Sequence, residues 1–293
     1  MANRSRLQIA KADIREHFSR LNTSTFRFKD LAAVLRQERS GWRLAQNTTA
    51  NHFIDFLAKQ GLLRVLRLEF PHRPETVYLW GNGPVLSALL HLKEHSFFSH
   101  YTAMRWLGLT EQVPNTLYIS HERAGKAPGR SELTQQLIDE AFSGPPRTSQ
   151  NIAQLDEWRV ALINSANTDE EGVVQDVQSG YGAPALVRFT NIERTLIDAV
   201  VRPSYSGGVA EVAKAFELAK DRFSANALAF MLKRLAYNYP YHQAIGFYME
   251  RAGYKPRQLG RFREDMRFDF YLTHGMEQTT YITDWKLYVP IGF

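Results

Sequence analysis

Apolar and polar residues follow a helical spacing over the first sixty residues of the chain. Apolar side chains recur every three or four positions in three segments, which predicts helices over about 5–21, 28–39 and 47–60. Asn47 is a favourable N-cap for the third helix, and Gly61 provides its stop. Two strand-like segments follow at 62–69 and 76–80. A proline-bounded loop separates them, which predicts a hairpin.

Three helices followed by a hairpin is the element order of a winged helix-turn-helix. The segment NHFIDFLAKQGLLRVL, residues 51–66, is typical of the junction where the third helix ends at a glycine and the first wing strand begins. In helix-turn-helix domains the recognition helix lies in the major groove of DNA. The pattern therefore predicts a winged helix-turn-helix DNA-binding domain over residues 1–80.

A second domain is predicted after Gly81-Asn82-Gly83-Pro84, the strongest break in the pattern. Helical periodicity continues beyond it near 84–94, 99–108, 131–142, 191–202, 207–220, 224–237 and 239–252. Strand-like segments occur at 115–120, 157–163, 184–189, 266–272 and 280–289. The predicted fold class is therefore α+β. An N-terminal winged helix-turn-helix precedes a larger mixed α/β domain over 84–293, with a sub-boundary expected near 144–150.

The positive charge of the chain is concentrated in its first quarter. The whole sequence carries a formal charge of +6. Residues 1–80 contain 14 Lys and Arg against 7 Asp and Glu, whereas residues 81–293 contain 22 against 23. A basic segment joined to a near-neutral one is typical of a nucleic-acid-binding domain attached to a different body. A solvated basic surface is the alternative explanation.

The composition excludes several classes of site. The chain has no cysteine, which excludes disulfides, thiolate-bound zinc and iron–sulfur centres, and thiol nucleophiles. Its apolar runs are too short for a transmembrane helix, and its N-terminal segment lacks the apolar core of a secretory signal. We therefore expect a cytoplasmic protein with no membrane partner.

The third predicted helix carries the candidate base contacts. With Ala50, Phe53, Ile54 and Leu57 facing the core, its polar residues face the other way. Asparagine pairs with adenine, threonine hydrogen-bonds or touches a thymine methyl, and histidine donates to guanine. The candidates for base contact are Gln46, Thr48, Thr49, Asn51 and His52, and Lys59 is a candidate for phosphate or guanine. A solvated polar helix face is the alternative.

Cationic side chains elsewhere in the first 80 residues are candidate phosphate contacts. A wing follows the DNA backbone or enters the minor groove, whose potential favours cations. The wing candidates are Arg64, Arg67, His72 and Arg73. Contacts that position the protein without specifying sequence are expected from Arg4, Arg6, Arg27 and Lys29. Each of these is alternatively a solvated surface charge.

Two motifs raise enzymatic alternatives. Residues His91 to His95 match H-x-x-E-H, a pattern in which two histidines bind zinc and the glutamate acts as base. Asp269, Asp284 and Lys286 resemble the acids and lysine of PD-(D/E)xK nucleases, which hold Mg²⁺ and activate water. The first motif lacks a third ligand, and the second is a common pattern of solvated strand charges. We therefore expect no catalytic residue, metal or cofactor.

Two hypotheses remain as alternatives to a DNA-binding protein without catalysis. One is a metal-dependent nuclease of the PD-(D/E)xK type that the winged helix delivers to DNA. The other is a ligand-responsive transcriptional regulator, which requires an enclosed apolar pocket with a few convergent polar groups in the second domain.

Two stretches of the second domain match a known pattern. The first is FFSHYTAMRWLGLTEQVP at 97–114, which continues to LYIS at 117–120. The second is NIERTLID at 191–198, which continues to RP at 202–203 and GGVAEV at 207–212. Together with the predicted winged helix, these stretches resemble the AbiEi-type antitoxin family of type IV abortive-infection systems over most of residues 26–220.

The resemblance implies an antitoxin of a type IV toxin–antitoxin system. Its winged helix would bind inverted repeats of double-stranded DNA in its own promoter and repress the operon. Its C-terminal domain would counter a nucleotidyltransferase-like toxin encoded alongside, without forming a stable complex with it.

Ordinary structural roles account for several residues of these stretches. Arg194 and Asp198 are four positions apart on a predicted helix and are expected to pair. Thr190 or Asn191 is the expected N-cap of that helix. Aromatic residues between positions 97 and 106 are expected in the core, not in a ligand site.

Overall fold

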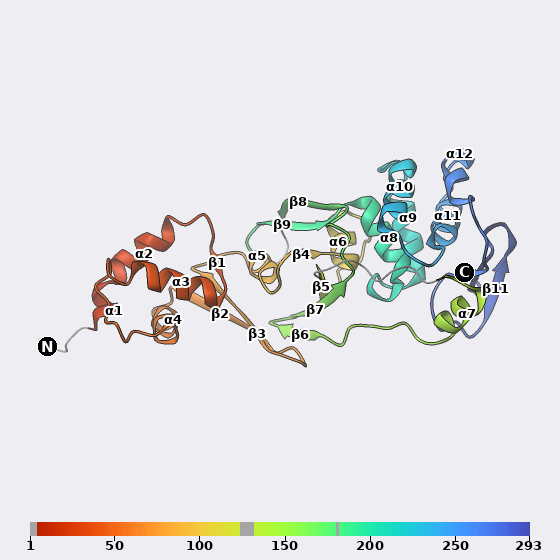
Figure 1. Ribbon diagram of the computed structural model, residues 1–293. Helices are drawn as coiled ribbons and strands as arrows, with labels where there is room; N and C mark the ends of the chain where they lie inside the picture. The colour runs from red at the N-terminus through yellow and green to blue at the C-terminus, as the bar shows by residue number, and fades with distance from the viewer. Residues whose placement is uncertain (1–4, 124–131, 180–181) are drawn as a thin grey trace. The chain divides into compact units, whose positions relative to one another are not determined.

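The computed structural model describes residues 5–123, 132–179 and 182–293, and the chain divides into two compact units (Figure 1). The first unit comprises Met1–Ser96 and Asp176–Val187, and the second comprises Phe97–Gln175 and Arg188–Phe293. Helices and strands are mixed along the chain, so the predicted α+β class is confirmed. Within the described ranges, no helix is both long enough and apolar enough to cross a membrane.

Helices of the first unit lie close to where the helical spacing predicts them. They are α1 (Arg6–Ile9), α2 (Lys11–Ser19), α3 (Phe28–Glu38) and α4 (Ala50–Lys59). The single helix predicted over 5–21 is divided at Ala10 into α1 and α2. Helix α4 begins later than predicted, because its N-cap is Thr49 and not Asn47.

A small antiparallel sheet of order β1-β3-β2 completes the fold of the first unit. Its strands are β1 (Thr25–Phe26), β2 (Leu63–Leu68) and β3 (Glu75–Trp80). The predicted hairpin is confirmed. β2 and β3 pair in antiparallel fashion, with Leu63 opposite Trp80 at one end and Leu68 opposite Glu75 at the other. β1 pairs with the other edge of β3 through Phe26 and Tyr78. A two-residue strand is too short to show a period, so the sequence pattern does not predict it.

Helix α5 (Val85–Leu90) belongs to the first unit, beyond the domain boundary expected at 81–84. Leu86 and Leu89 are fully buried, and α5 packs against β1 and β3. The turn-forming sequence at 81–84 therefore ends a strand without ending the compact unit. The first unit is also discontinuous in sequence, because it includes Asp176–Val187.

The larger sheet has the strand order β6-β7-β5-β4-β9-β8 (Figure 1). Its strands are β4 (Ser96–Phe98), β5 (Thr116–Glu122), β6 (Ile152–Leu155), β7 (Trp158–Ser165), β8 (Val173–Gln178) and β9 (Ala185–Thr190). β5 pairs with β7 and β4 with β9 in parallel, whereas β6 pairs with β7 in antiparallel fashion. The sequence pattern predicts β5, β7 and β9 and misses the other strands, which are short or largely exposed.

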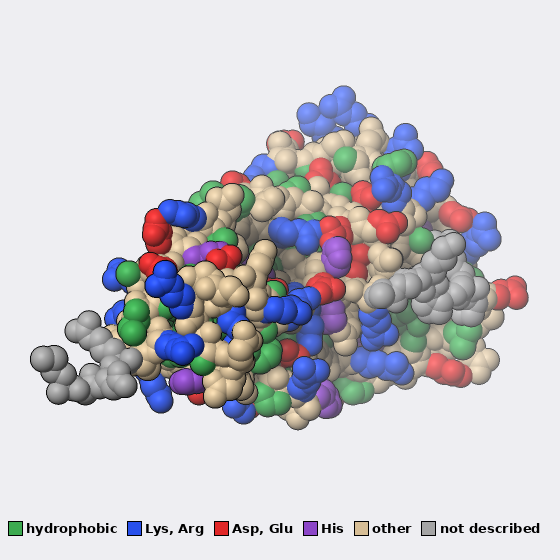
Figure 2. All heavy atoms as spheres, turned by 60° about the vertical axis from the view of Figure 1, so that its left-hand side comes forward, with side chains coloured by type: hydrophobic (Ala, Val, Ile, Leu, Met, Phe, Trp, Pro, Cys, Tyr) green, Lys and Arg blue, Asp and Glu red, His purple; other side chains and the backbone are tan. Residues whose placement is uncertain are grey.

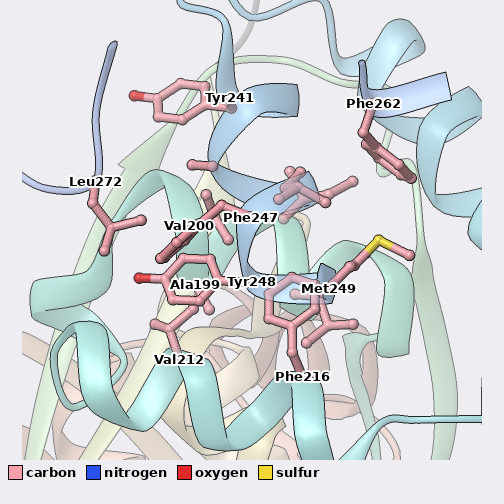
Figure 3. Close-up of a cluster of buried hydrophobic side chains, with 14 of the residues drawn as sticks. Ala199, Val200, Val212, Phe216, Tyr241, Phe247, Tyr248, Met249, Phe262 and Leu272 are labelled. Atoms are coloured by element: carbon pink, nitrogen blue, oxygen red, sulfur yellow. The ribbon is translucent and has the colours of Figure 1, made fainter. Parts of the chain in front are cut away.

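Helices of the second unit bury most of its apolar side chains. They are α6 (His100–Trp106), α7 (Gln135–Ser143), α8 (Ile192–Val201), α9 (Val209–Leu218), α10 (Ala225–Leu235), α11 (Tyr241–Arg251) and α12 (Pro256–Leu259). Side chains of α8, α9 and α11 meet in the core that Figure 3 shows, among them Val200, Phe216 and Tyr248. A Cβ on Gly246 of α11 would stand 2.1 Å from the Trp285 ring, so this close packing requires glycine.

The C-terminal residues form a small sheet of order β10-β12-β11 beside α11. Its strands are β10 (Phe270–Tyr271), β11 (Thr279–Ile282) and β12 (Leu287–Pro290). The continuous strand predicted over 280–289 is wrong, because the 3-10 turn η3 (Thr283–Trp285) interrupts it. The buried Gln243 amide donates hydrogen bonds to the backbone oxygens of Phe268, Trp285 and Lys286 at 3.0, 2.8 and 3.1 Å. One side chain of α11 thereby anchors the C-terminal segment.

Candidate functional site

Helix α4 presents the two faces that its sequence predicts. Phe53 and Leu57 are fully buried in the core of the first unit. Asn51, His52 and Lys59 are exposed on the opposite face. Their side chains make no hydrogen bond or ion pair with any other residue that the structure describes. An amide, an imidazole and an ammonium group are therefore available to a ligand along one side of α4.

The residues just before α4 differ from the prediction. Thr48 is only 7% exposed, so its expected place on the exposed face is wrong. The Thr49 hydroxyl is exposed but accepts the capping hydrogen bond from the His52 amide at 3.2 Å. The Arg39 guanidinium donates to the backbone oxygens of Ala45, Gln46 and Thr48 at 2.7, 3.0 and 2.9 Å. Sequence analysis missed this role of Arg39, because the three acceptors belong to an irregular loop.

The cations of the hairpin are exposed. Arg64 and Arg67 lie on β2, and His72 and Arg73 lie in the loop that leads to β3. Arg67 Nε lies 2.6 Å from Glu69 Oε1, whereas His72 and Arg73 have no side-chain partner in the described part of the chain. Solvent-exposed ion pairs contribute little free energy. Breaking the Arg67–Glu69 pair to bind a phosphate group would therefore cost little.

Arg27 and Lys29 share one acidic partner within the first unit. The Arg27 guanidinium donates to the backbone oxygen of His91 at 2.7 Å and to the Glu94 carboxylate at 3.1 Å. The Lys29 ammonium lies 3.2 Å from the same carboxylate. These bonds, first the one from Lys29, lower the pKa of Glu94 and keep it ionised. The two cations share one exposed carboxylate and keep a net positive charge, so their predicted phosphate contacts stay a prediction, with Arg27 held in place by the His91 oxygen.

The basic character of the first 80 residues is spread out. Arg6 is exposed on α1, and Arg4 lies outside the described residues. Figure 2 shows Lys and Arg side chains scattered over the visible surface, with Asp and Glu side chains between them. On that face the cations do not gather into one continuous patch. Of the cationic side chains predicted to contact DNA, Arg6, Lys59 and Arg73 are exposed and have no side-chain partner among the described residues.

Neither enzymatic motif gathers a metal site. Helix α5 ends before His91, so His91 and His95 do not share a helix face. Asp284 lies in the turn η3, and Lys286 follows it with φ +44°, so these residues do not lie on a regular strand. The Asp269 carboxylate accepts a hydrogen bond from a tyrosine hydroxyl at 2.6 Å. In the ranges 5–123, 132–179 and 182–293, no group of three or more His, Asp or Glu side chains could hold a metal ion.

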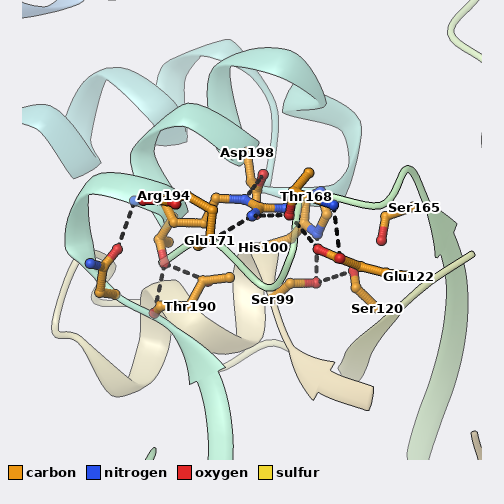
Figure 4. A network of polar contacts seen from close by, with 12 residues as sticks. Ser99, His100, Ser120, Glu122, Ser165, Thr168, Glu171, Thr190, Arg194 and Asp198 are labelled. Atoms are coloured by element: carbon orange, nitrogen blue, oxygen red, sulfur yellow. Dashed lines mark hydrogen bonds and ion pairs between the residues drawn. The ribbon is translucent and has the colours of Figure 1, made fainter. Parts of the chain in front are cut away.

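A buried polar network surrounds the start of α8 in the second unit (Figure 4). Asn191 is the N-cap, since its side chain accepts a hydrogen bond from the Arg194 amide at 2.9 Å. One turn later, Arg194 Nε lies 2.8 Å from Asp198 Oδ1, with 4% and 7% of the two side chains exposed. The predicted i,i+4 pair is confirmed. The Arg194 guanidinium also donates to the Glu171 backbone oxygen at 2.7 Å and to Thr168 Oγ1 at 3.2 Å.

Burial and charge oppose each other at Arg194. Burial disfavours the charged guanidinium, but the Asp198 carboxylate and the Tyr237 hydroxyl outweigh that penalty and raise the pKa of Arg194. The pKa of Tyr237 is raised in turn, mainly by burial and then by Asp198. Arg194 therefore keeps its charge at neutral pH, beside Asp198 and a protonated phenol.

Gly172 allows the segment before β8 to approach α8. Its φ is +75°, in the left-handed region, and its carbonyl accepts a hydrogen bond from the Asn191 amide at 2.8 Å. A Cβ on this residue would stand 2.6 Å from the Cβ of Arg194. The sequence pattern did not indicate this glycine, because the residues it packs against lie about twenty or more positions further along the chain.

The network continues through α6 and β5. Ser99 Oγ lies 2.8 Å from His100 Nδ1 and 2.7 Å from Ser120 Oγ. Burial lowers the pKa of His100 to about 4, although the Asp198 carboxylate partly opposes the shift. Ser99 is fully buried and His100 is 6% exposed, so this Ser–His contact is closed to a substrate.

Comparison with known proteins shows similarity in fold. No family model matches the chain, and no curated protein matches it. Among solved structures, the crystal structure of RV2827C protein from Mycobacterium tuberculosis is similar, with a TM-score of 0.56 and 15% sequence identity. The match covers 96% of this chain and 91% of that chain, so both units take part in it. At this identity the comparison establishes a shared fold over nearly the whole length of both proteins.

Proposed function

We propose that the first unit is a winged helix-turn-helix that binds double-stranded DNA, with α4 as the recognition helix and β2–β3 as the wing. The exposed face of α4 carries this proposal, because Asn51, His52 and Lys59 lie there without partners among the described residues. Amide and imidazole groups suit base edges in the major groove, and an ammonium group suits phosphate. Arg73 of the wing loop supplies a further phosphate contact.

The whole chain is proposed to be an antitoxin and autorepressor of the AbiEi type. The resemblance of 97–120 and 191–212 to that family supports this assignment. The second stretch contains the cap and the ion pair that build the buried network around α8. In this proposal the first unit represses the operon at inverted repeats of its promoter. The second unit counters a nucleotidyltransferase-like toxin, and neither unit requires a catalytic residue, metal or cofactor.

DNA binding is tested by fluorescence anisotropy with the full chain and a duplex from the region upstream of its own gene. Binding should weaken steeply with salt, with log K falling by about 0.9 per log unit of salt for each phosphate contact. Asn51→Ala should lose about 1–3 kcal/mol on the promoter duplex and little on random DNA. Arg73→Ala should weaken both duplexes similarly and reduce the salt slope by about 1.

Arg257→Ala provides a charge-matched control for these variants. Arg257 is exposed on α12 in the second unit and has no side-chain partner among the described residues. Its removal should leave both affinities unchanged. A salt-independent affinity, or equal losses from the Asn51 and Arg73 substitutions on both duplexes, would show that α4 is not the recognition helix.

The antitoxin role is tested in cells that express the toxin encoded next to this gene. The full chain, supplied from an unrelated promoter, should restore growth. A variant with Asn51, Lys59 and Arg73 all changed to alanine should lose repression of the operon and keep this protection. Loss of protection in that variant, with its fold intact by circular dichroism, would show that the DNA-binding surface itself takes part in neutralisation.

A further inference from the structure

A groove of about 1000 Å³ opens where the end of α10 meets the start of α11, entirely within the second unit. Residues of the 3-10 turn η2 (Gly260–Phe262) and of the segment after it line the opposite side. This volume lies at the upper end of the range found for small-molecule pockets. The proposed DNA-binding face of α4 belongs to the other unit, so the groove is a separate feature of the chain.

Aromatic side chains line much of the groove. The Phe230 ring is 63% exposed. The rings of Tyr237 and Tyr241 meet edge to face with centroids 5.4 Å apart, and Tyr239 stands 6.2 Å from Tyr241 at 85°. Such contacts hold the tyrosine rings in fixed orientations. Tyr241 is buried, so the ring open to a ligand is that of Phe230, over which the Arg234 guanidinium lies 5.9 Å from the centroid. A flat aromatic ligand gains free energy by stacking on this ring.

The charges at the groove favour an anionic ligand. Its lining includes Lys233, Arg234 and Arg261, together with Glu264 and Asp265. Arg234 and Asp265 each form an ion pair at 2.6 Å with a residue outside the groove lining. Among the described residues, no carboxylate pairs with Lys233 or Arg261, and no cation pairs with Glu264. Two unpaired cations therefore face one unpaired acid.

Two side chains of the lining have unused hydrogen-bonding atoms. Arg261 Nε donates to the Asn226 amide oxygen at 2.9 Å, which orients the guanidinium and leaves its other N–H groups for an anion. The Nε2 atom of His242 is buried and has no partner in the described part of the chain. A buried polar atom without a partner is costly, and a ligand that bonds to it removes that cost.

We infer that this groove binds a nucleotide. Its base stacks on the exposed Phe230 ring, and its phosphate is held by Arg261 and Lys233. A polar group of the ligand completes the hydrogen bonding of His242. A nucleotide combines in one molecule a flat ring for Phe230 and an anion for the unpaired cations, whereas an aliphatic anion or a neutral aromatic molecule uses only one of these contacts.

The inference is tested by isothermal titration calorimetry on the full chain. The probes are the four nucleoside 5′-monophosphates AMP, GMP, CMP and UMP, with the matching nucleosides and inorganic phosphate as half-ligands. At least one nucleotide should bind about tenfold or more tightly than its nucleoside and than phosphate, because only it engages both sides of the groove. If inorganic phosphate binds as tightly as the nucleotides do, the groove is a simple anion site and the inference is overturned.

Two variants assign the contacts. Arg261→Ala should weaken the nucleotide about tenfold and leave its nucleoside unchanged, whereas Arg257→Ala, a neighbouring exposed arginine outside the groove, should have no effect. Phe230→Ala should weaken nucleotide and nucleoside alike. Leu137→Ala is its control, since Leu137 is an exposed apolar residue of α7 that does not line the groove.

Each outcome decides the proposal. Phe230 and Arg261 are both exposed, so circular dichroism and thermal unfolding should show that both variants fold as the wild type does. Absence of binding by all four nucleotides, or wild-type affinity in folded Arg261→Ala and Phe230→Ala proteins, would overturn it. Because α4 is not altered in these variants, promoter binding measured in parallel separates this test from that of the DNA-binding proposal.

Discussion

Removal of the Asp198 carboxylate should destabilise the second unit more than removal of any exposed acid. In Asp198→Ala the Arg194 guanidinium stays buried, with 4% of its side chain exposed, and loses its only charged hydrogen-bond partner among the described residues. The backbone oxygen of Glu171 and the hydroxyl of Thr168 remain as acceptors, but they carry no charge. An uncompensated buried charge is the main cause of the predicted loss.

The expected magnitude follows from the burial of the pair. Removing one partner of a buried ion pair costs about 3–5 kcal/mol. For a unit of this size, about 1 kcal/mol lowers the Tm by roughly 2–4 °C, so we expect a decrease of about 6–20 °C. Glu217→Ala is the matched control, because Glu217 pairs with Lys214 on α9 while both side chains are about half exposed. That change should cost no more than about 0.5 kcal/mol.

Urea denaturation followed by circular dichroism and tryptophan fluorescence measures both variants. A double variant, Arg194→Met with Asp198→Leu, isolates the cause, because it removes both charges and keeps apolar volume in the site. It should be less destabilised than Asp198→Ala. A loss below about 1 kcal/mol in Asp198→Ala, or a larger loss in the double variant than in the single one, would refute the role assigned to the unpaired charge.

Three further predictions concern stability. Gly172→Ala should cost about 2 kcal/mol or more in urea denaturation, because its φ is +75° and its Cβ would collide with Arg194; wild-type stability would contradict this close approach. Gly246→Ala should lower the Tm and shift the Trp285 fluorescence, since the new methyl group would overlap the indole ring; an unchanged spectrum and Tm would count against it. Acidification should destabilise the protein through His100, whose pKa falls from 6.5 to about 4 on folding. The unfolded state binds this proton first, so stability is fully present above pH 6.5 and is lost as the pH falls towards 4, by about 3 kcal/mol in total. His100→Gln should flatten the pH dependence of the urea midpoint in that interval, and an unaltered slope would exclude His100 as its source.

Local patterns in the sequence were sufficient to predict the elements of the first unit that carry the proposed site. Apolar spacing placed α3, α4 and the β2–β3 hairpin within a few residues of their observed bounds. The same kind of signal predicted α8, its cap at Thr190 or Asn191 and the pair between Arg194 and Asp198. These features succeed because caps, helix periods and i,i+4 pairs depend on residues within one or two turns of each other.

Features that join distant segments were decided by the tertiary structure. Arg27 and Lys29 both pair with Glu94, more than sixty positions away, and no local pattern indicates this shared partner. Thr48 is buried in an irregular loop whose backbone oxygens accept hydrogen bonds from Arg39. Strands β1 and β4 are too short to show a period and exist through pairing with remote strands.

The sequence by itself determined the type of local structure, the exposed face of α4 and the absence of thiol chemistry. Only the tertiary structure decided which charged side chains have no partner and that residue 172 must be glycine to pack closely against α8. It also decided that α10, α11 and η2 line a groove. The physical reason is the range of each interaction. Hydrophobic periodicity and capping are properties of neighbouring residues, whereas charge neutralisation, close packing and cavities arise between segments that only folding brings together.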